Sequence, residues 1–215
     1  MNGLSIFGAN SLTKLLIEFI NEDGGTVESV VVDDEHWSSE LFHGVPRLRY
    51  SSVRRPTRIV SAVGYKDMRA RRRIFDRLKQ DGHDIANYIS SRADVSRSVQ
   101  IGTGNIVMPG VVIEPLARIG SGNLFWSRTL ICHEVIVGDH NYIAANCVVG
   151  GHSHIGDLCF MGNSSTTIDG VALADETHAL PGSILFEDTE AHTKYLGAPA
   201  RSIGFHKDTG IVIQR

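Results

Sequence analysis

One hydrophobic position recurs at every sixth residue through the second half of the chain. A helix repeats its buried positions about every 3.6 residues and a strand every second residue, so neither explains this series. A short fixed period indicates a solenoid, and a six-residue period predicts a parallel β-helix. All but one of the seventeen positions are apolar: Ile89, Val95, Ile101, Val107, Ile113, Ile119, Phe125, Ile131, Val137, Ile143, Val149, Ile155, Met161, Thr167, Leu173, Ala179 and Leu185.

Further series predict the corners of the β-helix. Small residues such as Ala117, Cys147 and Ser165 stand two residues before the hydrophobic positions. A period of eighteen residues equals three sixes and predicts three flat faces per coil, with coils about 4.8 Å apart. Stacked Asn side chains would pass hydrogen bonds along one corner, and Gly would supply the positive φ of sharp turns. The eighteen-residue series are Asn87, Asn105, Asn123 and Asn141, and Gly102, Gly120, Gly138 and Gly156.

Residues 1–86 do not follow the six-residue rule. Apolar runs predict strands at 4–7, 27–32 and 58–63, with one helix after the first strand, capped by Asn10 or Ser11, and another over 67–79. Residues 35–56 are expected to form a long loop. The alternation of strands and helices predicts a small parallel βαβ sheet, in which ligands bind beyond the carboxyl ends of the strands.

Composition narrows the functional classes. The 215 residues are 42% hydrophobic and have a net charge of −3, which gives no basic surface for nucleic acid. No apolar run reaches the roughly 18 residues of a membrane span, and the N-terminal residues do not resemble a signal peptide. Three cysteines without a CxxC motif exclude a disulfide framework. We expect a soluble, cytoplasmic protein.

The tandem [LIV]-G-x4 pattern, which closes with Gly197-Ala198-Pro199-Ala200-Arg201, resembles the hexapeptide-repeat acyltransferases. This resemblance implies a left-handed β-helix, a homotrimer, and active sites in the clefts between neighbouring prisms. Leu124 and Trp126 are expected to be exposed on a face that needs a partner. The expected domains are a Rossmann-like domain over 1–86, the β-helix over 87–186 and a C-terminal extension over 187–215.

The domain in front of the β-helix narrows the resemblance. A Rossmann-like domain followed by a left-handed β-helix resembles the sialic-acid O-acetyltransferase and bacillosamine N-acetyltransferase group, which acts on sugars or nucleotide-linked sugars. The first loop in that group is close to GxGGH, whereas this chain keeps only the first glycine. The resemblance implies that the nucleotide-linked sugar is bound by Gly8, Ala9, Asn10, Ser11, Asp33, Asp34, Gly64 and Tyr65.

Acyl transfer needs a base beside the acceptor and hydrogen-bond donors that face the developing oxyanion. His133 follows the hydrophobic position Ile131 by two residues and is expected to project outward near a corner. Residues 131–139 resemble the catalytic segment of the family, where His is followed by an acidic residue and then by Ile-Gly-Asp. The resemblance implies that His133 is the general base, that Glu134 orients its ring, and that the amide of Gly151, one coil later, is the oxyanion donor.

The resemblance also implies where coenzyme A binds. The matching positions are Tyr142, Gly151, Gly162, Asn163, Gly182, Ala198 and Pro199. His152 and His154 form a His-x-His pair, but two histidines without a supporting carboxylate or Cys are not typical of a metal site. We expect no metal.

The sequence and this resemblance thus favour an acetyl-CoA-dependent N-acetyltransferase that acts on a nucleotide-linked amino sugar of the 4-amino-4,6-dideoxy type. The resemblance alone implies that the product is used for surface polysaccharides or glycans. The amine would attack the thioester directly, because no Cys or Ser is evidently placed as a nucleophile. The alternatives are an O-acetyltransferase of the sialic-acid type, a transferase that uses acyl carrier protein, and a non-catalytic trimeric β-helix scaffold.

Overall fold

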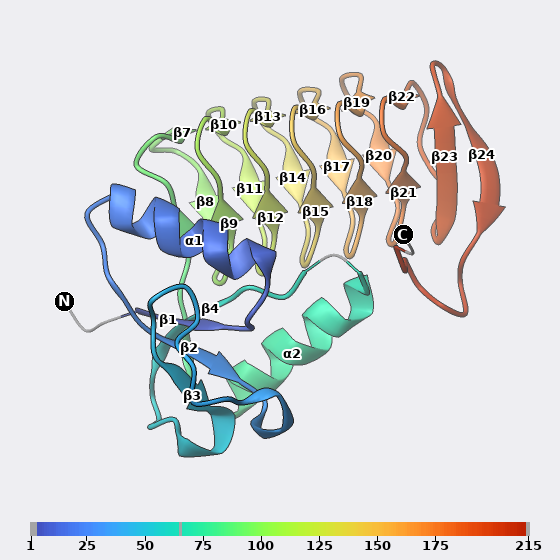
Figure 1. The fold of residues 1–215 in the computed structure, drawn as a ribbon. Coiled ribbons are helices and arrows are strands. Elements are labelled where there is room, and N and C mark those ends of the chain that lie inside the picture. Colours follow the sequence, from blue (N-terminus) through green and yellow to red (C-terminus); the bar gives the residue numbers. More distant parts are fainter. Residues whose placement is uncertain (1–3, 65, 214–215) are drawn as a thin grey trace.

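The computed structural model describes residues 4–64 and 66–213. From residue 88 onward the chain winds into a left-handed parallel β-helix in which three two-residue strands make one triangular coil (Figure 1). The second residue of each strand is the six-residue position found in the sequence. The predicted fold class is therefore confirmed.

Each face of the prism is a sheet of stacked strands. Face one contains β6 (Tyr88–Ile89), β9 (Ile106–Val107), β12 (Leu124–Phe125), β15 (Tyr142–Ile143), β18 (Phe160–Met161) and β21 (His178–Ala179). Face two contains β7 (Asp94–Val95), β10 (Val112–Ile113), β13 (Leu130–Ile131), β16 (Val148–Val149), β19 (Thr166–Thr167) and β22 (Ile184–Leu185). Face three contains β8 (Gln100–Ile101), β11 (Arg118–Ile119), β14 (Ile136–Val137), β17 (His154–Ile155) and β20 (Ala172–Leu173).

The hydrophobic positions fill the interior of the prism. From Val107 to Leu185 every one of them is at most 4% exposed, whereas Ile89, in the first coil, is 40% exposed. Thr167, the polar exception, is also buried, and its hydroxyl accepts a hydrogen bond from the amide of Gly150 at 3.0 Å. The interior thus tolerates a hydroxyl where a backbone donor satisfies it.

The Asn series forms the predicted hydrogen-bonded column. The Oδ1 atom of Asn105 accepts from the amide of Asn123 at 2.9 Å, and that of Asn123 accepts from the amide of Asn141 at 2.8 Å. The Nδ2 atom of Asn123 donates to the carbonyl of Gly138 at 2.9 Å. Each Asn therefore bonds its own coil to the next one and fixes the eighteen-residue register between them.

The role predicted for the Gly series was wrong. Gly102, Gly120, Gly138 and Gly156 do not have positive φ; they are needed because the coils approach closely, and a Cβ on Gly120 would lie 2.6 Å from the carbonyl oxygen of Gly138. The left-handed residues stand two positions later in each turn, with φ of 54–75°. They define three edges: the α2 edge (Gly104, Gly122, His140, Leu158, Glu176), the His133 edge (Leu116, Glu134, His152, Gly170) and the Asn163 edge (Gly110, Arg128, Asn146, Ser164, Gly182).

We expect Asn123→Ala to lower the free energy of unfolding by about 2 to 4 kcal/mol, because the amide of Asn141 and the carbonyl of Gly138 lose their buried partner. Urea denaturation measures the change. The matched control is Asn163→Ala at an exposed turn, which should stay within about 0.5 kcal/mol of the wild type. Equal effects of the two substitutions would contradict a stabilising role for the column.

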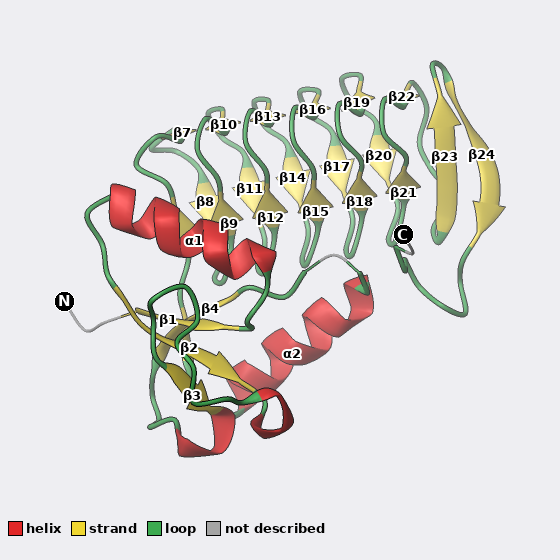
Figure 2. Ribbon diagram, in the orientation of Figure 1, coloured by secondary structure: helices red, strands yellow, loops and turns green. Residues whose placement is uncertain are grey.

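The N-terminal domain is a parallel sheet between two helices (Figure 2). Residues of β1, β2 and β4 alternate between the two sides: Ile6, Val30 and Val60 pack with α1, and Phe7, Val31 and Ile59 with α2. The sheet order is β3 (Arg47–Arg49), β2 (Val27–Val32), β1 (Leu4–Phe7), β4 (Arg58–Ser61) and β5 (Asp84–Ile85); the helices are α1 (Ser11–Glu22) and α2 (Met68–Gln80), with 3-10 turns η1 (Asp34–His36) and η2 (Tyr50–Ser52).

This sheet confirms the parallel βαβ prediction, and Asn10 is the N-cap of α1. Residues 35–56 are not one long loop, because they contain β3, η2 and the last two residues of η1. Neither of the two helices in the described part of the chain is long and apolar enough to cross a membrane.

Helix α2 runs along the α2 edge and holds the two domains together. The Arg71 guanidinium is 6% exposed and donates to the carbonyls of Val63 (2.7 Å) and Gly122 (2.9 Å). Phe75 packs against Gly104, where a Cβ would lie 2.4 Å from its ring, and Arg69 forms an ion pair with Glu176 at 2.9 Å. The first two turns of α2 thus contact three coils of the prism.

Face one is covered and does not face solvent. Its outward residues, from Tyr88 to His178, are all at most 9% exposed. Leu124 is fully buried, so its expected exposure was wrong. Trp126 is half-buried. The period of six assigns Leu124 to the outer side of the prism, but it does not reveal that another domain lies there.

The C-terminal residues close the far end of the prism and then return. β23 (Thr193–Gly197) pairs with β21 in parallel and with β24 (Ala200–Phe205) in antiparallel fashion, so the Ala198-Pro199 segment is a hairpin turn. Beyond β24, Nε2 of His206 donates to the carbonyl oxygen of Glu176 at 2.8 Å, and the carbonyl of Ile211 accepts from the amide of Met68 at the start of α2. The tail therefore contacts both domains.

Stability should depend on pH through His178, which packs edge-to-face on Phe160 and faces His206 and Lys194. Burial, with smaller contributions from His206 and Lys194, lowers the pKa of His178 to about 4. The unfolded chain binds a proton near pH 6.5 that the folded chain does not bind until about pH 4. Stability should therefore fall as pH decreases, by about 2 kcal/mol between pH 7 and pH 5 for this group.

Urea denaturation of the wild type and of His178→Gln at several pH values tests this dependence. Between pH 7 and pH 5 the variant should lose about 2 kcal/mol less stability than the wild type. The exposed His36→Gln serves as the control and should keep the wild-type slope. Parallel slopes for all three proteins would rule out this role for His178.

Candidate active site

His133 lies on the His133 edge, in the turn that leads from β13 to β14. Its side chain is 50% exposed, and its Nδ1 atom lies 3.4 Å from Oε2 of Glu134. Adjacent residues of an extended strand point to opposite sides, but Glu134 has a left-handed conformation with φ of 59°, which interrupts that alternation. The turn therefore allows a histidine and the next carboxylate to meet.

The coil that follows contributes a second imidazole. His152 occupies the same left-handed position as Glu134, eighteen residues later, and its Nδ1 atom lies 3.6 Å from the same Oε2 atom. The two rings are perpendicular, with centroids 4.9 Å apart. Glu134 is therefore shared by two histidines. Sequence reasoning paired His152 with His154 and missed this contact, although the eighteen-residue period relates position 152 to position 134.

Backbone hydrogen bonds between coils hold this group in place. The amide of His133 donates to Oε2 of Glu114 at 2.8 Å, and the amide of His152 donates to the carbonyl of His133 at 3.1 Å. The amide of Glu134 donates to the carbonyl of Pro115 at 3.1 Å. The backbone of His133, Glu134 and His152 is therefore fixed, whereas their exposed side chains can change rotamer.

Gly151 lies directly beside the His133 ring. A Cβ at this position would be 2.9 Å from both Cε1 and Nε2 of His133, so only glycine leaves the ring its place. Its amide, however, is not free: it donates to Oδ1 of Asp169 at 2.9 Å. The expected oxyanion donor is thus next to the expected base but is bonded to a carboxylate in this structure, a contact that the sequence reasoning did not anticipate.

Cys132 precedes His133 but has the wrong chemistry for a nucleophile. Partial burial, together with the negative charges of Glu114 and Asp169, raises the pKa of its thiol. A raised pKa keeps the thiol protonated at neutral pH, and the thiolate is the reactive form. This agrees with direct transfer, without an acyl-cysteine intermediate.

The residues expected to bind coenzyme A are on other parts of the prism. Gly162, Asn163 and Gly182 lie at the Asn163 edge, where the carbonyl of Asn163 accepts from the amide of Gly182 at 2.9 Å. Tyr142 is 6% exposed on the covered face one, where its ring is stacked on Phe160 with centroids 4.8 Å apart, so little of its side chain is accessible to coenzyme A within one copy of the chain. Ala198 and Pro199 lie in the β23–β24 turn.

The expected nucleotide-binding residues do gather at the carboxyl ends of β1, β2 and β4. Gly8, Ala9, Asn10 and Ser11 follow β1, Asp33 and Asp34 follow β2, and Gly64 lies beyond the end of β4; Tyr65 lies outside the described residues.

Several of these side chains are already engaged. Asn10 accepts from the amide of Leu12 at 2.8 Å and donates to the carbonyl of Ala62 at 2.7 Å. Asp33 pairs with Arg77 at 2.8 Å. Asp34 accepts from the Ser51 hydroxyl and amide, which lower its pKa. Ala9 and Ser11, on either side of the N-cap of α1, are exposed, and the N-terminus of a helix favours an anion.

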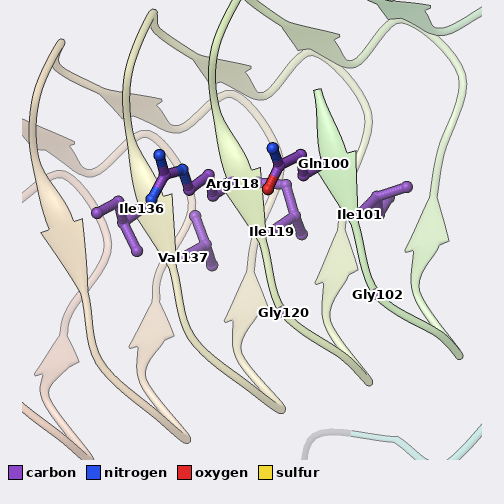
Figure 3. Close-up of a pocket in the computed structure, with 8 residues that line it drawn as sticks. All are labelled: Gln100, Ile101, Gly102, Arg118, Ile119, Gly120, Ile136 and Val137. Atoms are coloured by element: carbon purple, nitrogen blue, oxygen red, sulfur yellow. The ribbon is translucent and has the colours of Figure 1, made fainter. Parts of the chain in front are cut away.

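A shallow, open depression lies on face three, away from the chemistry (Figure 3). It is lined by residues of β8, β11 and β14, and the side chains around it include Gln100, Arg118 and Ile136. None of its lining residues is a base or a nucleophile at neutral pH. We therefore place the candidate active site at the His133 edge rather than in this depression.

A thiol-reactivity experiment tests the environment of Cys132. Cys147 and Cys159 are buried, so the half-buried Cys132 should react first with a disulfide reagent, and slowly at pH 7.5. Replacing a nearby carboxylate, as in Glu114→Gln, removes a negative charge and should lower the thiol pKa and speed the reaction. Glu187→Gln, on a distant exposed segment, provides the control. A reaction no faster in Glu114→Gln than in the control would show that this carboxylate does not influence the thiol.

Solved structures of sugar acetyltransferases match this chain over almost its whole length. The perosamine N-acetyltransferase PerB from Caulobacter crescentus, solved with CoA and GDP-perosamine, is 25% identical, with a TM-score of 0.84 over 95% of this chain and 98% of that chain. The acetyltransferase domain of PglB from Neisseria gonorrhoeae, solved also with acetyl coenzyme A, is 22% identical, with a TM-score of 0.86 over 94% of this chain and all of that chain.

A third match covers less of the chain. AntD, an N-acyltransferase from Bacillus cereus solved with dTDP and coenzyme A, is 17% identical, with a TM-score of 0.55 over 62% of this chain and 89% of that chain. No model of a known protein family matches the sequence. The resemblance to hexapeptide-repeat sugar acetyltransferases is therefore confirmed at the level of the fold.

Proposed function

We propose that the protein is an acetyl-CoA-dependent N-acetyltransferase whose acceptor is the amino group of a nucleotide-linked sugar, of the 4-amino-4,6-dideoxy type. The observation on which this depends is the exposed His133–Glu134 pair on a prism edge of a fold shared with PerB and the PglB domain. Both domains of those acetyltransferases are matched, including the nucleotide-binding type of sheet in front of the prism.

In the proposed reaction the amine nitrogen attacks the thioester carbonyl while Nε2 of His133 accepts the proton that the amine loses. The tetrahedral intermediate then expels the sulfur of coenzyme A, which takes the proton from His133 and leaves as the thiol. The amide product and coenzyme A account for all atoms. Glu134, next to Nδ1, keeps the proton of neutral His133 on that nitrogen and stabilises the imidazolium, as the Asp of a serine-protease triad does.

Gly151 supports the same step if its amide becomes free. The amide is next to the His133 ring, where the oxyanion of the intermediate would form, but Asp169 now accepts its hydrogen bond. A carboxylate beside an oxyanion repels it, so we propose that the exposed Asp169 side chain turns away when the thioester binds. The backbone of Gly151 would then donate to the oxyanion.

The site requires more than one copy of the chain. His133 is on one edge of the prism, and the candidate coenzyme A residues Gly162, Asn163 and Gly182 are on another, so one copy cannot bring them together. We propose a homotrimer in which the His133 edge of one copy faces the Asn163 edge of the next. Face two, which joins these edges, has half-buried apolar side chains available for such contacts, among them Val112, Leu130 and Val148.

The decisive experiment measures thiol release from acetyl-CoA with GDP-, UDP- and dTDP-linked 4-amino-4,6-dideoxy sugars. One of these should be acetylated, and His133→Ala should lower kcat about 100-fold or more, which is the usual contribution of a general base. His154→Ala, at an exposed histidine of β17, is the control and should retain the wild-type rate.

Turnover that survives in His133→Ala would reject His133 as the base. A protein that binds coenzyme A but acetylates none of the amino sugars, and instead acetylates the hydroxyl of a sialic acid, would reject an amine acceptor. No binding of coenzyme A would reject the proposed function altogether.

A further inference from the structure

We propose that His133, Glu134 and His152 bind one divalent transition-metal ion such as Zn²⁺, and that the bound ion takes His133 out of use as a base. The metal site itself does not depend on the proposed function; only the inhibition does. Among the described residues this is the single group of three His, Cys, Asp or Glu side chains whose donor atoms lie within 4.8 Å of one another.

The two distances from Glu134 fit a tetrahedral ion, and all three donor atoms lie within 4.8 Å of one another. Zinc binds histidine nitrogen and carboxylate oxygen at about 2.1 Å, so two ligand atoms at a tetrahedral angle lie about 3.4 Å apart. In the structure, Oε2 of Glu134 lies 3.4 Å from Nδ1 of His133 and 3.6 Å from Nδ1 of His152. Two histidines and one carboxylate, with one position open to water, are a known zinc ligand set.

The backbone of the site is organised before an ion arrives. His152 donates from its amide to the carbonyl of His133, and the amides of His133 and Glu134 are bonded to Glu114 and Pro115. The three side chains are 47–58% exposed, so an ion can reach them and their rotamers can adjust. Binding therefore costs little ordering of the chain.

The surrounding charge favours a cation. Glu114, Glu134 and Asp169 are close to this edge, as their contacts with His133, His152 and Gly151 show. Within residues 4–64 and 66–213, no Lys or Arg forms an ion pair with any of these three carboxylates. A positive ion would neutralise a local excess of negative charge. Two imidazole donors favour Zn²⁺ and its neighbours over Mg²⁺ or Ca²⁺, which prefer oxygen.

The bound ion has a definite consequence for the proposed reaction. Coordination of a neutral imidazole through Nδ1 leaves the proton of the ring on Nε2. Nε2 then has no lone pair to accept the proton of the attacking amine. Glu134, bound to the ion, no longer stabilises a protonated His133 ring. Occupation of the site should therefore inhibit acetyl transfer, and removal of the ion should restore it.

Binding is measured first, by calorimetric titration of the full-length, tag-free protein with Zn²⁺, and with Co²⁺ as a spectroscopic probe of tetrahedral geometry. We expect one ion per chain. His152→Asn should weaken binding at least about 10-fold, since loss of even an indirect partner of a metal costs that much. Asparagine tolerates the left-handed conformation of this turn, so the variant should fold. His154→Asn, an exposed histidine outside the group, should bind like the wild type.

Absence of Zn²⁺ binding, or equal binding by wild type and His152→Asn, would overturn the metal site.

Thiol release is then measured with and without Zn²⁺ and a chelator, and the rate of each protein is compared with its own metal-free rate. Zn²⁺ should inhibit the wild type reversibly and inhibit His152→Asn only at concentrations at least about 10-fold higher. Binding without inhibition would overturn the second half of the proposal. A protein that binds Zn²⁺ but transfers no acetyl group would retain the metal site and refute the proposed function instead.

Discussion

The eighteen-residue register between coils is the constraint on which the rest of the structure depends. It is held by the Asn column, in which Asn105, Asn123 and Asn141 each bond to the coil that follows, and by the backbone ladders of three sheets. Because the register is constant, residues eighteen apart are neighbours, and this places Gly151 beside His133 and Asp169 beside Gly151. A shift of one residue would move every inward side chain to the outside and dissolve the candidate site together with the core.

A triangular prism has three faces, and this chain uses them differently. Face one is covered by the N-terminal domain, which α2 attaches to the α2 edge through Arg71 and Phe75. The His133 edge and the Asn163 edge remain open, separated by face two with its half-buried apolar side chains. The chemistry therefore lies where the fold leaves edges uncovered, and the two open edges are those that a second copy could bring together in the proposed assembly.

The sequence predicted the parts of the fold that repeat, because a repeat states the same contact many times. The interior positions and the Asn column were found in this way, whereas the first two strands, from Leu4 and from Val27, were found from their continuous apolar runs. Contacts that occur once were not. β3 is a three-residue strand, Arg47–Arg49, whose single apolar residue, Leu48, is too little to form an apolar pattern. Tyr142 has the outward position that its period assigns, but the pattern does not tell whether solvent or a second domain lies outside. The spacing placed Gly151 beside His133. It did not show that Asp169 accepts a hydrogen bond from the Gly151 amide, because that contact depends on a side-chain rotamer.

Glu134 unites the two properties inferred for the His133 edge. A carboxylate next to one imidazole makes that ring a better base, whereas the same carboxylate between two imidazoles makes a ligand set for a metal ion. The difference between the two arrangements is one residue, His152, at a turn where the left-handed conformation aims its side chain at Glu134. The identity of the residue at this turn therefore decides whether the edge offers a base alone or a base that a metal ion can occupy.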